Sequence, residues 1–540
     1  MKNNEVQNIT DYLYQFARKS PDKSILLHPN RVSYKAFCKL VDAYATGFQK
    51  AGITKGIRTI VLLKPGVDLF ATTFALLRIG AIPVMIDAGM GIKAMVKALA
   101  NTGAEAFVGI PKSLLLKYIF PKEFKKVKVW ISGGYCLGLP AMPLSEFRKN
   151  EKNCYTVARI NPDEVTAIFY TSGSTGPAKG VVYTRSMMEA QIACLKNYFK
   201  YNPLETDLCT FPLIGLFSMC LGLSVVLADM DMLHPVRLKP EKLVLNIYWY
   251  GCTYLFCSPM VLKKLAEYCT RENLKLNSLK RVMTAGAAVS PELLSNFAQV
   301  ISFDAQIHTP YGATEALPVT DIHHKELLDL YENTPGYLKG ICVGYPLENI
   351  ALRIIRITDN VIGKWDETIE CSSNEVGEIV VSGDSVSQEY LNNEEANRIS
   401  KIRTDTGEQV WHRTGDLGRI DEHGRVWFYG RKSHRIETVS ETMFTIPVEA
   451  VFNRHPQVER SALVGVVTNG KTKPVVCIQT KKGAGKNKEL VNELNELARK
   501  NEVTSRISEF LFHKNFPVDA RHNAKIYREK LAEWAQEKIK

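Results

Sequence analysis

Residues 170–180, which read YTSGSTGPAKG, have the residue types of a loop that binds a phosphate group. Glycines adopt backbone conformations that other residues resist, and they let the backbone approach a phosphate closely. Hydroxyl groups and successive backbone N–H groups then form a concave anion site, to which a lysine adds positive charge. The spacing of a Walker A loop is not present. The candidate phosphate-binding residues are Thr171, Ser172, Gly173, Ser174, Thr175, Gly176 and Lys179.

The alternative to a phosphate loop is a flexible Ser/Gly linker. Apolar runs on both sides of the segment argue against a linker. Residues 165–170 before the loop and residues 181–183 after it are typical of buried strands. A linker would need neither run. We therefore expect the loop to leave the edge of a sheet.

Three later motifs carry further candidate residues. Small residues, Ala285-Gly286-Ala287-Ala288, follow a strand-like run, and the alternative is a simple strand-to-helix turn before a helix start. The motif Tyr311-Gly312-Ala313-Thr314-Glu315 offers a carboxylate that suits a hard cation such as Mg²⁺. In residues 412–418, HRTGDLG, Asp416 can accept hydrogen bonds from paired hydroxyls, and the alternative is an Asx turn between strands.

The elements that must position these residues follow two patterns. Apolar runs alternate with amphipathic segments in the first part of the chain, which predicts parallel sheets covered by helices. After Gly430 the pattern restarts, and we place a boundary near residues 431–434, giving domains 1–432 and 433–540. Expected strands are 59–63, 81–86, 376–382, 426–429, 461–467 and 473–478, and expected helices are 67–79, 92–101, 448–453, 489–500 and 524–538.

Composition excludes several classes of protein. The 540 residues exceed what one core usually supports, and 45% hydrophobic with 23% charged residues is typical of a globular protein. We find no signal peptide, no transmembrane segment and no C-x-x-C pair among twelve cysteines, which favours reduced cysteines and a cytoplasmic location. The net charge is +13, and residues 431–540 hold +8 of it. A solvated surface explains this excess better than nucleic-acid binding, for which no motif is present.

The motifs, in this order, resemble those of the adenylate-forming superfamily of acyl-CoA synthetases, luciferases and peptide-synthetase adenylation domains. The resemblance implies an α/β fold: a large N-terminal domain of helix-flanked mixed sheets and a small, mobile α+β C-terminal domain. It also implies ATP and Mg²⁺. The implied roles are phosphate binding by residues 171–179, an adenine face at Gly286, Ala287 and Ala288, adenine stacking by Tyr311 beside Gly312, α-phosphate binding by Thr314, Mg²⁺ binding by Glu315, ribose binding by Asp416 and Arg431, and transition-state stabilisation by Lys525.

Departures from the family pattern point to a subgroup. Residues 211–217 and the position near Arg185 lack the histidine that relatives often carry, and the hinge position is Ser433. The loop 436–449 lacks the glycine that leaves room for a pantetheine arm in thioester-forming relatives. Residues 86–91, 228–231, 430–435 and 516–526 resemble the β-lactone synthetases of bacterial olefin biosynthesis (OleC-type). In the late motif the usual S-G-K-I is Asn-Ala-Lys-Ile, so Lys525 is either catalytic or one more surface lysine.

Three hypotheses about function follow. The first is adenylation of a long-chain β-hydroxy fatty acid and closure to a β-lactone; the second is a fatty acyl-CoA synthetase. The third is a non-catalytic nucleotide-binding protein that uses its basic C-terminal domain. Residues 211–223 are either a wall of the acyl pocket or a plain buried strand and turn. Expected partners are the acid, enzymes of an olefin or lactone pathway and, at the periphery, a membrane surface.

Overall fold

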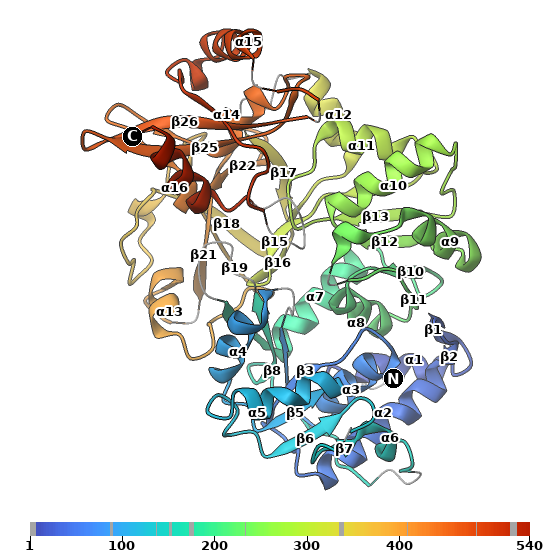
Figure 1. Cartoon of the computed structure of the whole chain (residues 1–540). Helices are drawn as coiled ribbons and strands as arrows, with labels where there is room; N and C mark the ends of the chain where they lie inside the picture. Colours follow the sequence, from blue (N-terminus) through green and yellow to red (C-terminus); the bar gives the residue numbers. More distant parts are fainter. Residues whose placement is uncertain are drawn as a thin grey trace.

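The computed structural model describes residues 7–86, 90–136, 138–150, 154–171, 178–232, 234–333, 340–407, 409–481, 483–485, 487–518 and 526–539, with only the backbone of Thr171 and Asn333. Two seven-stranded sheets, a third antiparallel sheet and a C-terminal α+β unit make up the fold (Figure 1). Of the helices described, none combines the length and the apolar character that a membrane crossing requires. All twelve cysteines are free, and eight of them are buried.

The first sheet carries the candidate phosphate loop between its last two strands. All strand pairs are parallel except the pair that flanks the loop, β8 and β9, which is antiparallel. Both faces are covered by helices, which explains why the strands are continuous apolar runs. Helices α2 (Tyr34–Lys50) and α3 (Val67–Arg78) pack on one face, and α4 (Ile92–Ala100), η2 (Pro111–Leu115) and α5 (Leu116–Ile119) on the other. In sheet order the strands are β7 (Met142–Pro143), β6 (Val129–Ser132), β5 (Ala106–Gly109), β3 (Arg58–Leu62), β4 (Ile82–Ile86), β8 (Val165–Thr171) and β9 (Lys179–Thr184).

The second sheet is also parallel, apart from its edge pair β1 and β2. Helices α9 (Pro240–Tyr250), α10 (Pro259–Arg271) and α11 (Pro291–Ala298) cover one face. Helices α7 (Arg185–Asn197) and α8 (Pro212–Cys220) lie in the core shared with the first sheet. In sheet order the strands are β14 (Gln306–His308), β13 (Arg281–Thr284), β12 (Tyr254–Cys257), β10 (Thr206–Cys209), β11 (Ser224–Leu227), β1 (Ser24–His28) and β2 (Val32–Ser33).

The third sheet is antiparallel and holds two of the predicted motifs. Its strands, in sheet order, are β15 (Tyr311–Ala313), β16 (Ala316–Asp321), β17 (Ile341–Pro346), β22 (Val426–Arg431), β21 (Val410–Ile420), β19 (Gly377–Gly383) and β18 (Ile350–Ile355), with β20 (Lys401–Arg403) beside β21. The remaining elements outside the C-terminal unit are α1 (Asp11–Lys19), α6 (Leu144–Phe147), α12 (His324–Asn333), α13 (Glu394–Ser400), η3 (Pro235–Arg237) and η5 (Glu367–Ile369).

The C-terminal unit has its own hydrophobic cores on the two faces of a three-stranded sheet. The predicted boundary falls where β22 ends at Arg431 and the short helix η6 (Lys432–His434) begins. After it come the hairpin β23 (Ile436–Glu437) and β24 (Thr442–Met443), the strands β25 (Val458–Thr468), β26 (Lys471–Thr480) and β27 (Phe510–Phe512), and the helices α14 (Thr445–Phe452), α15 (Lys488–Arg499), η7 (Glu502–Thr504) and α16 (Arg528–Lys538).

Two structural alternatives from the sequence are wrong. Residues 211–223 do not form a strand and turn: most of them form α8, which begins at Pro212, where the fixed φ of proline suits the first helical position. Asp416 does not sit in a turn between strands, because it lies inside the continuous strand β21, next to Gly415 with a φ of +70°. The predicted strands and helices are otherwise present, with shifted ends; α16, for example, begins at Arg528 rather than at residue 524.

Candidate active site

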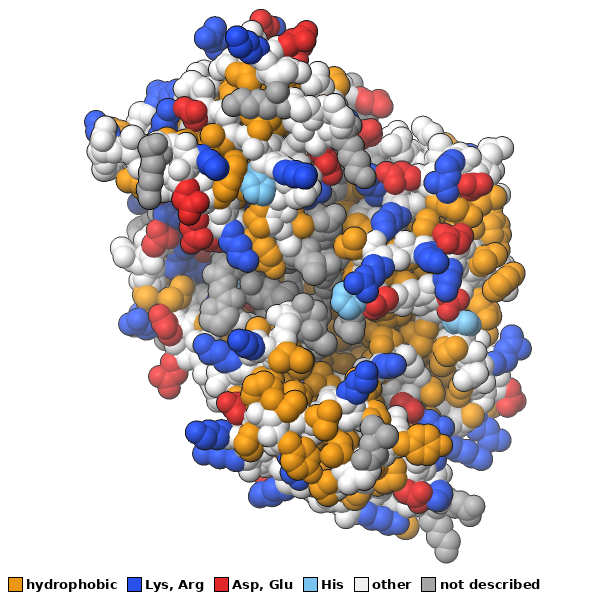
Figure 2. Space-filling model, viewed as in Figure 1, with side chains coloured by type: hydrophobic (Ala, Val, Ile, Leu, Met, Phe, Trp, Pro, Cys, Tyr) orange, Lys and Arg blue, Asp and Glu red, His pale blue; other side chains and the backbone are white. Residues whose placement is uncertain are grey.

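A large cavity of about 1760 Å³ opens where the three sheets and the C-terminal unit meet. It exceeds the several hundred Å³ that are usual for a small-molecule site. Figure 2 shows the hollow on the face of the molecule. The predicted site residues that line it are Lys179, Gly286, Ala287, Ala288, Tyr311, Gly312, Thr314, Glu315, Asp416 and Arg431. The predicted residues Ser172, Gly173, Ser174, Thr175, Gly176 and Lys525 lie outside the described residues, as does the side chain of Thr171.

One corner of the cavity is built by strand pairing. Asp416 on β21 lies directly opposite Arg431 on β22, and Arg431 Nε is 3.1 Å from Asp416 Oδ1. The Tyr311 hydroxyl donates a hydrogen bond to Asp416 Oδ2 at 2.7 Å. The Asp416 carboxylate raises the pKa of the Arg431 guanidinium, and burial raises the pKa of Tyr311, so both remain donors at neutral pH. This fixed set of one aromatic ring, one carboxylate and one guanidinium suits a nucleoside.

The turn after Tyr311 holds the next group of candidate residues close to this corner. A Cβ added at Gly312 would lie 2.7 Å from the carbonyl oxygen of Ala316, so the tight β15–β16 turn requires glycine. The Tyr183 hydroxyl donates to the carbonyl oxygen of Thr314 at 2.8 Å and fixes the turn from below. Tyr311, Thr314 and Glu315 therefore reach the cavity from one short, rigid segment.

Two residues that sequence reasoning missed, Tyr390 and Lys401, position Glu315. The Tyr390 hydroxyl donates to Glu315 Oε1 at 2.6 Å. The Lys179 Nζ is 4.9 Å and the Lys401 Nζ 5.3 Å from the centre of the Tyr390 ring, within the range of a cation–π contact. Lys401 also donates to the carbonyl oxygen of Ser387. Burial lowers the pKa of Lys401 to about 7.

The donor set fits Mg²⁺ in one respect. Glu315 supplies a carboxylate oxygen, held in place by Tyr390, beside the phosphate-binding candidate Lys179. The part of the chain that is described contains no group of three or more His, Cys, Asp or Glu side chains that could hold a metal. A magnesium ion here would take its other ligands from phosphate oxygens and water, as it commonly does.

The structure of the small-residue motif, residues 285–288, is compatible with both interpretations, a wall of the nucleotide site and a strand-to-helix turn. Ala285, Gly286, Ala287 and Ala288 line the cavity, and Gly286 has a φ of +91°, which favours glycine. The same residues connect β13 to α11, whose first turn is capped by Ser290 Oγ accepting from the backbone N–H of Leu293 at 3.2 Å.

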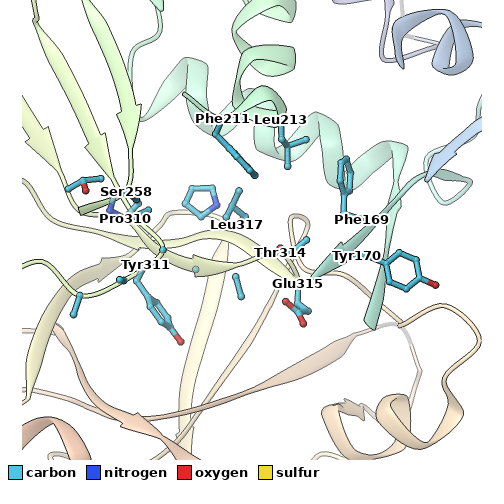
Figure 3. Close-up of a pocket in the computed structure, with 18 of the residues that line it drawn as sticks. Phe169, Tyr170, Phe211, Leu213, Ser258, Pro310, Tyr311, Thr314, Glu315 and Leu317 are labelled. Atoms are coloured by element: carbon cyan, nitrogen blue, oxygen red, sulfur yellow. The ribbon is translucent and has the colours of Figure 1, made fainter. Parts of the chain in front are cut away.

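The other side of the cavity is apolar. Figure 3 shows Phe211 and Leu213 extending toward Pro310 and Leu317, while the Tyr311 ring and the Glu315 carboxylate point away from them. The segment from Pro310 to Leu317 thus separates an apolar compartment from a polar one. Further apolar lining comes from Ile214, Phe217, Phe256 and Met283.

Gln191 on α7 is a polar exception within this apolar lining. The residue is 2% exposed and borders the cavity. Its Nε2 lies 3.5 Å from the Tyr183 hydroxyl, and within the described structure its Oε1 has no hydrogen-bond partner. A buried, unpaired carbonyl oxygen costs stability, so this atom favours a ligand that donates a hydrogen bond. No motif around residue 191 identifies it in the sequence.

The C-terminal unit closes the cavity from above. Ile526 and Arg528, the neighbours of Lys525 within the described residues, line it together with Glu449. Arg528 Nη2 donates to both carboxylate oxygens of Glu449 at 2.7 Å, which fixes the start of α16 against α14.

Charged residues anchor the segment that links the two parts of the chain. Buried Glu378 Oε2 lies 2.6 Å from Arg413 Nη2 and 3.0 Å from Lys432 Nζ. Farther along, Arg435 Nη2 lies 2.5 Å from Asp359 Oδ2. The expected hinge residue, Ser433, lies between these two anchors.

Residues 13–391 match the family of AMP-binding enzymes, and the chain belongs to that family. It is 38% identical to the olefin β-lactone synthetase of Xanthomonas campestris pv. campestris over 98% of this chain and 97% of that protein. It is 36% identical to the olefin β-lactone synthetase of Stenotrophomonas maltophilia over 98% of both. The fold matches O-succinylbenzoate coenzyme A synthetase (MenE) from Bacillus subtilis, solved in complex with ATP and magnesium ion, with a TM-score of 0.76 at 20% identity over 96% of this chain and 98% of that one. The resemblance and the fold class expected from the sequence are confirmed.

Proposed function

We propose that this protein activates a long-chain β-hydroxy acid as its acyl-adenylate and then closes the acyl group to a β-lactone. Similarity to two olefin β-lactone synthetases over almost the whole chain carries this proposal. The cavity supports it, because a polar compartment for a nucleotide adjoins an apolar compartment for an alkyl chain.

In the first step, a carboxylate oxygen of the acid attacks the α-phosphorus of ATP. A C(O)–O–P bond forms, the bond from the α-phosphorus to the bridging oxygen breaks, and pyrophosphate leaves. Lys179 and residues 171–176 hold the phosphates, Thr314 the α-phosphate, and Lys525 the charge that develops in the transition state. Glu315 would hold Mg²⁺, which when bound neutralises phosphate charge. Gly286, Ala287, Ala288 and Tyr311 face the adenine, while Asp416 and Arg431 bind the ribose.

In the second step, the 3-hydroxyl oxygen attacks the acyl carbonyl carbon. The ring C–O bond forms, the acyl–phosphate C–O bond breaks, AMP leaves with the electron pair of that bond, and the hydroxyl proton passes to water. The nucleophile is already tethered, so no second substrate has to bind. Gln191 Oε1 would accept the hydrogen bond of the 3-hydroxyl, because Gln191 borders the cavity and this oxygen has no hydrogen-bond partner within the described structure.

The alternative is a fatty acyl-CoA synthetase, with CoA as the second nucleophile. The hairpin β23–β24 lies in the loop that lacks the expected glycine, and its turn is closed by the Thr438 hydroxyl and the Glu441 carbonyl. The loop has no glycine that would make room for a pantetheine arm. The absence of this glycine favours β-lactone formation over CoA transfer.

The cellular location and the partners of the protein are part of the same proposal. We assign the protein to the cytoplasm, with the acid as substrate, enzymes of an olefin or lactone pathway as partners, and no nucleic acid. We also propose that the protein contacts a membrane at its periphery.

The test is mass spectrometry of the products from purified protein, ATP, Mg²⁺ and long-chain 3-hydroxy acids, with and without CoA. We expect a product lighter than the acid by one water, formed without CoA and lost in the Lys525→Ala variant. A thioester formed only with CoA would overturn the lactone and leave an acyl-CoA synthetase.

A second experiment uses ATP–pyrophosphate exchange to test whether Gln191 selects acids that carry a 3-hydroxyl. The variant is Gln191→Leu. Without the amide, ATP–pyrophosphate exchange with 3-hydroxy acids should fall about tenfold, as expected for one lost hydrogen bond, while exchange with unsubstituted acids stays unchanged. An equal loss for both acids would show that Gln191 only supports the fold.

A further inference from the structure

The helices that cover one face of the first sheet expose an unusual set of apolar side chains. On α4, η2 and α5 these are Ile92 at 61% exposed, Leu115 at 44%, Tyr118 at 52% and Ile119 at 63%. We call this surface the α4–α5 face. The inner sides of the same elements share one core, through Met95, Leu114 and Leu116, so their outer sides point the same way. Figure 2 shows hydrophobic side chains gathered over the part of the molecule where Figure 1 places α4 and α5, with lysine or arginine side chains beside them.

The charge of this face is strongly positive. Residues 90–130 contain eight lysines, two glutamates and neither arginine nor aspartate, a net charge of +6. Within the described structure only Lys128 of these lysines forms an ion pair, with Glu105 at 3.5 Å. Lys117 Nζ lies 5.5 Å from the centre of the Trp130 ring, and none of the remaining six lysines has an ion-pair partner among the described residues. Lysine is a compact, flexible point charge, which suits many dispersed phosphates better than one fixed carboxylate.

The α4–α5 face borders the mouth of the cavity. Ile92 and Lys112 are both exposed to solvent and part of the cavity wall. The cavity wall also includes Met95 of α4, Leu116 of α5 and Ile110, which directly precedes η2, and all three are apolar. Apolar side chains of this part of the chain therefore line the cavity wall beside the exposed face.

We propose that the α4–α5 face docks on an anionic lipid bilayer and presents the cavity mouth to it. Aliphatic side chains and an amphipathic tyrosine enter the headgroup region, while the lysines interact with lipid phosphates near the surface. The advantage of such docking, direct uptake of a long-chain acid, rests on the proposed function; the docking itself does not.

The experiment is co-sedimentation of the full chain with vesicles of phosphatidylcholine alone or mixed with phosphatidylglycerol, without ATP or acid. We expect binding to the anionic vesicles only, weakened by salt because exposed charges are screened. The double variant Tyr118→Glu/Ile119→Glu, at two exposed positions of this face outside the cavity wall, should bind at least about tenfold more weakly, a change equivalent to about 1.4 kcal/mol. The matched control is Trp249→Glu on α9, where an apolar side chain is 70% exposed far along the chain from this face; its vesicle binding should equal that of the wild type.

Circular dichroism and melting should be the same for all three proteins, and so should product formation from acid dissolved in detergent. Equal loss of vesicle binding in the α4–α5 variant and the Trp249 control would overturn the proposal. Failure to bind any vesicle would also overturn it and leave an acidic protein as the occupant of this face. If instead no product forms from detergent-dissolved acid, the proposed function fails while the vesicle result still stands.

Discussion

Glu315 is held by a tyrosine whose ring has two lysines within cation–π distance. Tyr390 donates its hydroxyl to the carboxylate, while Lys179 and Lys401 both lie within cation–π distance of its ring. Lys179 borders the cavity, whereas Lys401 is buried and does not line it. We expect Lys401 to act as a positioning residue, which holds Tyr390, and through it Glu315, in place without touching the substrate.

The titration of Lys401 gives a prediction about stability. Burial lowers its pKa from 10.5 to about 7, with Lys179 and Arg403 acting in the same direction and Glu315 and Glu389 opposing. Between these two values the unfolded chain binds the proton that the folded chain has lost, so this group's contribution to stability rises with pH. Lys401→Met should therefore melt higher than the wild type near neutral pH and below, and its advantage should shrink as the pH rises toward about 10.

Calorimetry or fluorescence melting across this pH range measures the difference between the two proteins. The control is Lys196→Met, which removes an exposed lysine of α7. It should show no pH-dependent difference from the wild type. A constant difference for Lys401→Met would contradict the assigned titration.

At the scale of elements, the end of β22 and the start of η6 are tied to the antiparallel sheet by charge. Glu378 on β19 is 1% exposed and compensates two cations, Arg413 on β21 and Lys432 on η6. The residues that bind the ribose in our proposal, Asp416 and Arg431, lie on the same two strands, β21 and β22. This ion network therefore determines where the ribose corner and the linking segment sit relative to each other.

Glu378→Ala should destabilise the protein strongly, because it leaves the buried Arg413 without its carboxylate partner and removes the nearer of two carboxylates beside the partly buried Lys432. Breaking a buried pair costs about 3–5 kcal/mol. Glu370→Ala is the matched control: its carboxylate is partly exposed and 3.6 Å from Arg353, so a loss of about 0–1 kcal/mol is expected. Denaturant unfolding of both variants compares them, and equal midpoints would contradict the role of Glu378.

At the scale of the whole molecule, one cavity is walled by both parts of the chain. Tyr311 and Asp416 line it from the antiparallel sheet, and Glu449, Ile526 and Arg528 from the C-terminal unit. A ligand that fills both the polar and the apolar compartments would contact every layer of the fold. Binding and the relative position of the two parts should therefore be coupled.

A non-hydrolysable acyl-adenylate analogue tests this coupling. At a free concentration of 100 times its Kd it should stabilise the folded protein by about 2.7 kcal/mol. It should also protect the segment around Ser433 from proteolysis, because it bridges the parts on either side. AMP alone, which lacks the acyl chain, is the control and should protect less. Unfolding of the C-terminal unit at an unchanged temperature, with the rest stabilised, would contradict the coupling.

Local sequence determined much of this protein. The strands on either side of the phosphate loop and the alternating strands and helices could be predicted from local patterns. Tyr311, Glu315, Asp416 and Arg431 could be chosen because their short motifs resemble those of adenylate-forming enzymes, and the structure places all four in the wall of one cavity. Even the glycine of the turn after Tyr311 has a local cause, since a Cβ there would meet the backbone of Ala316.

The tertiary structure alone decided the rest. Tyr390, Lys401 and Gln191 carry no motif, and they reach the cavity only because distant strands and helices pack together: Tyr390 meets Glu315 across 75 positions of the chain. The segment after Phe211 was ambiguous for a related reason, because a short apolar run fits a buried strand or a buried helix equally well. Packing against the shared core and the proline at its first turn made it a helix. Periodicity and motifs report what a residue needs locally, whereas burial, pKa and neighbours arise only when the chain has folded.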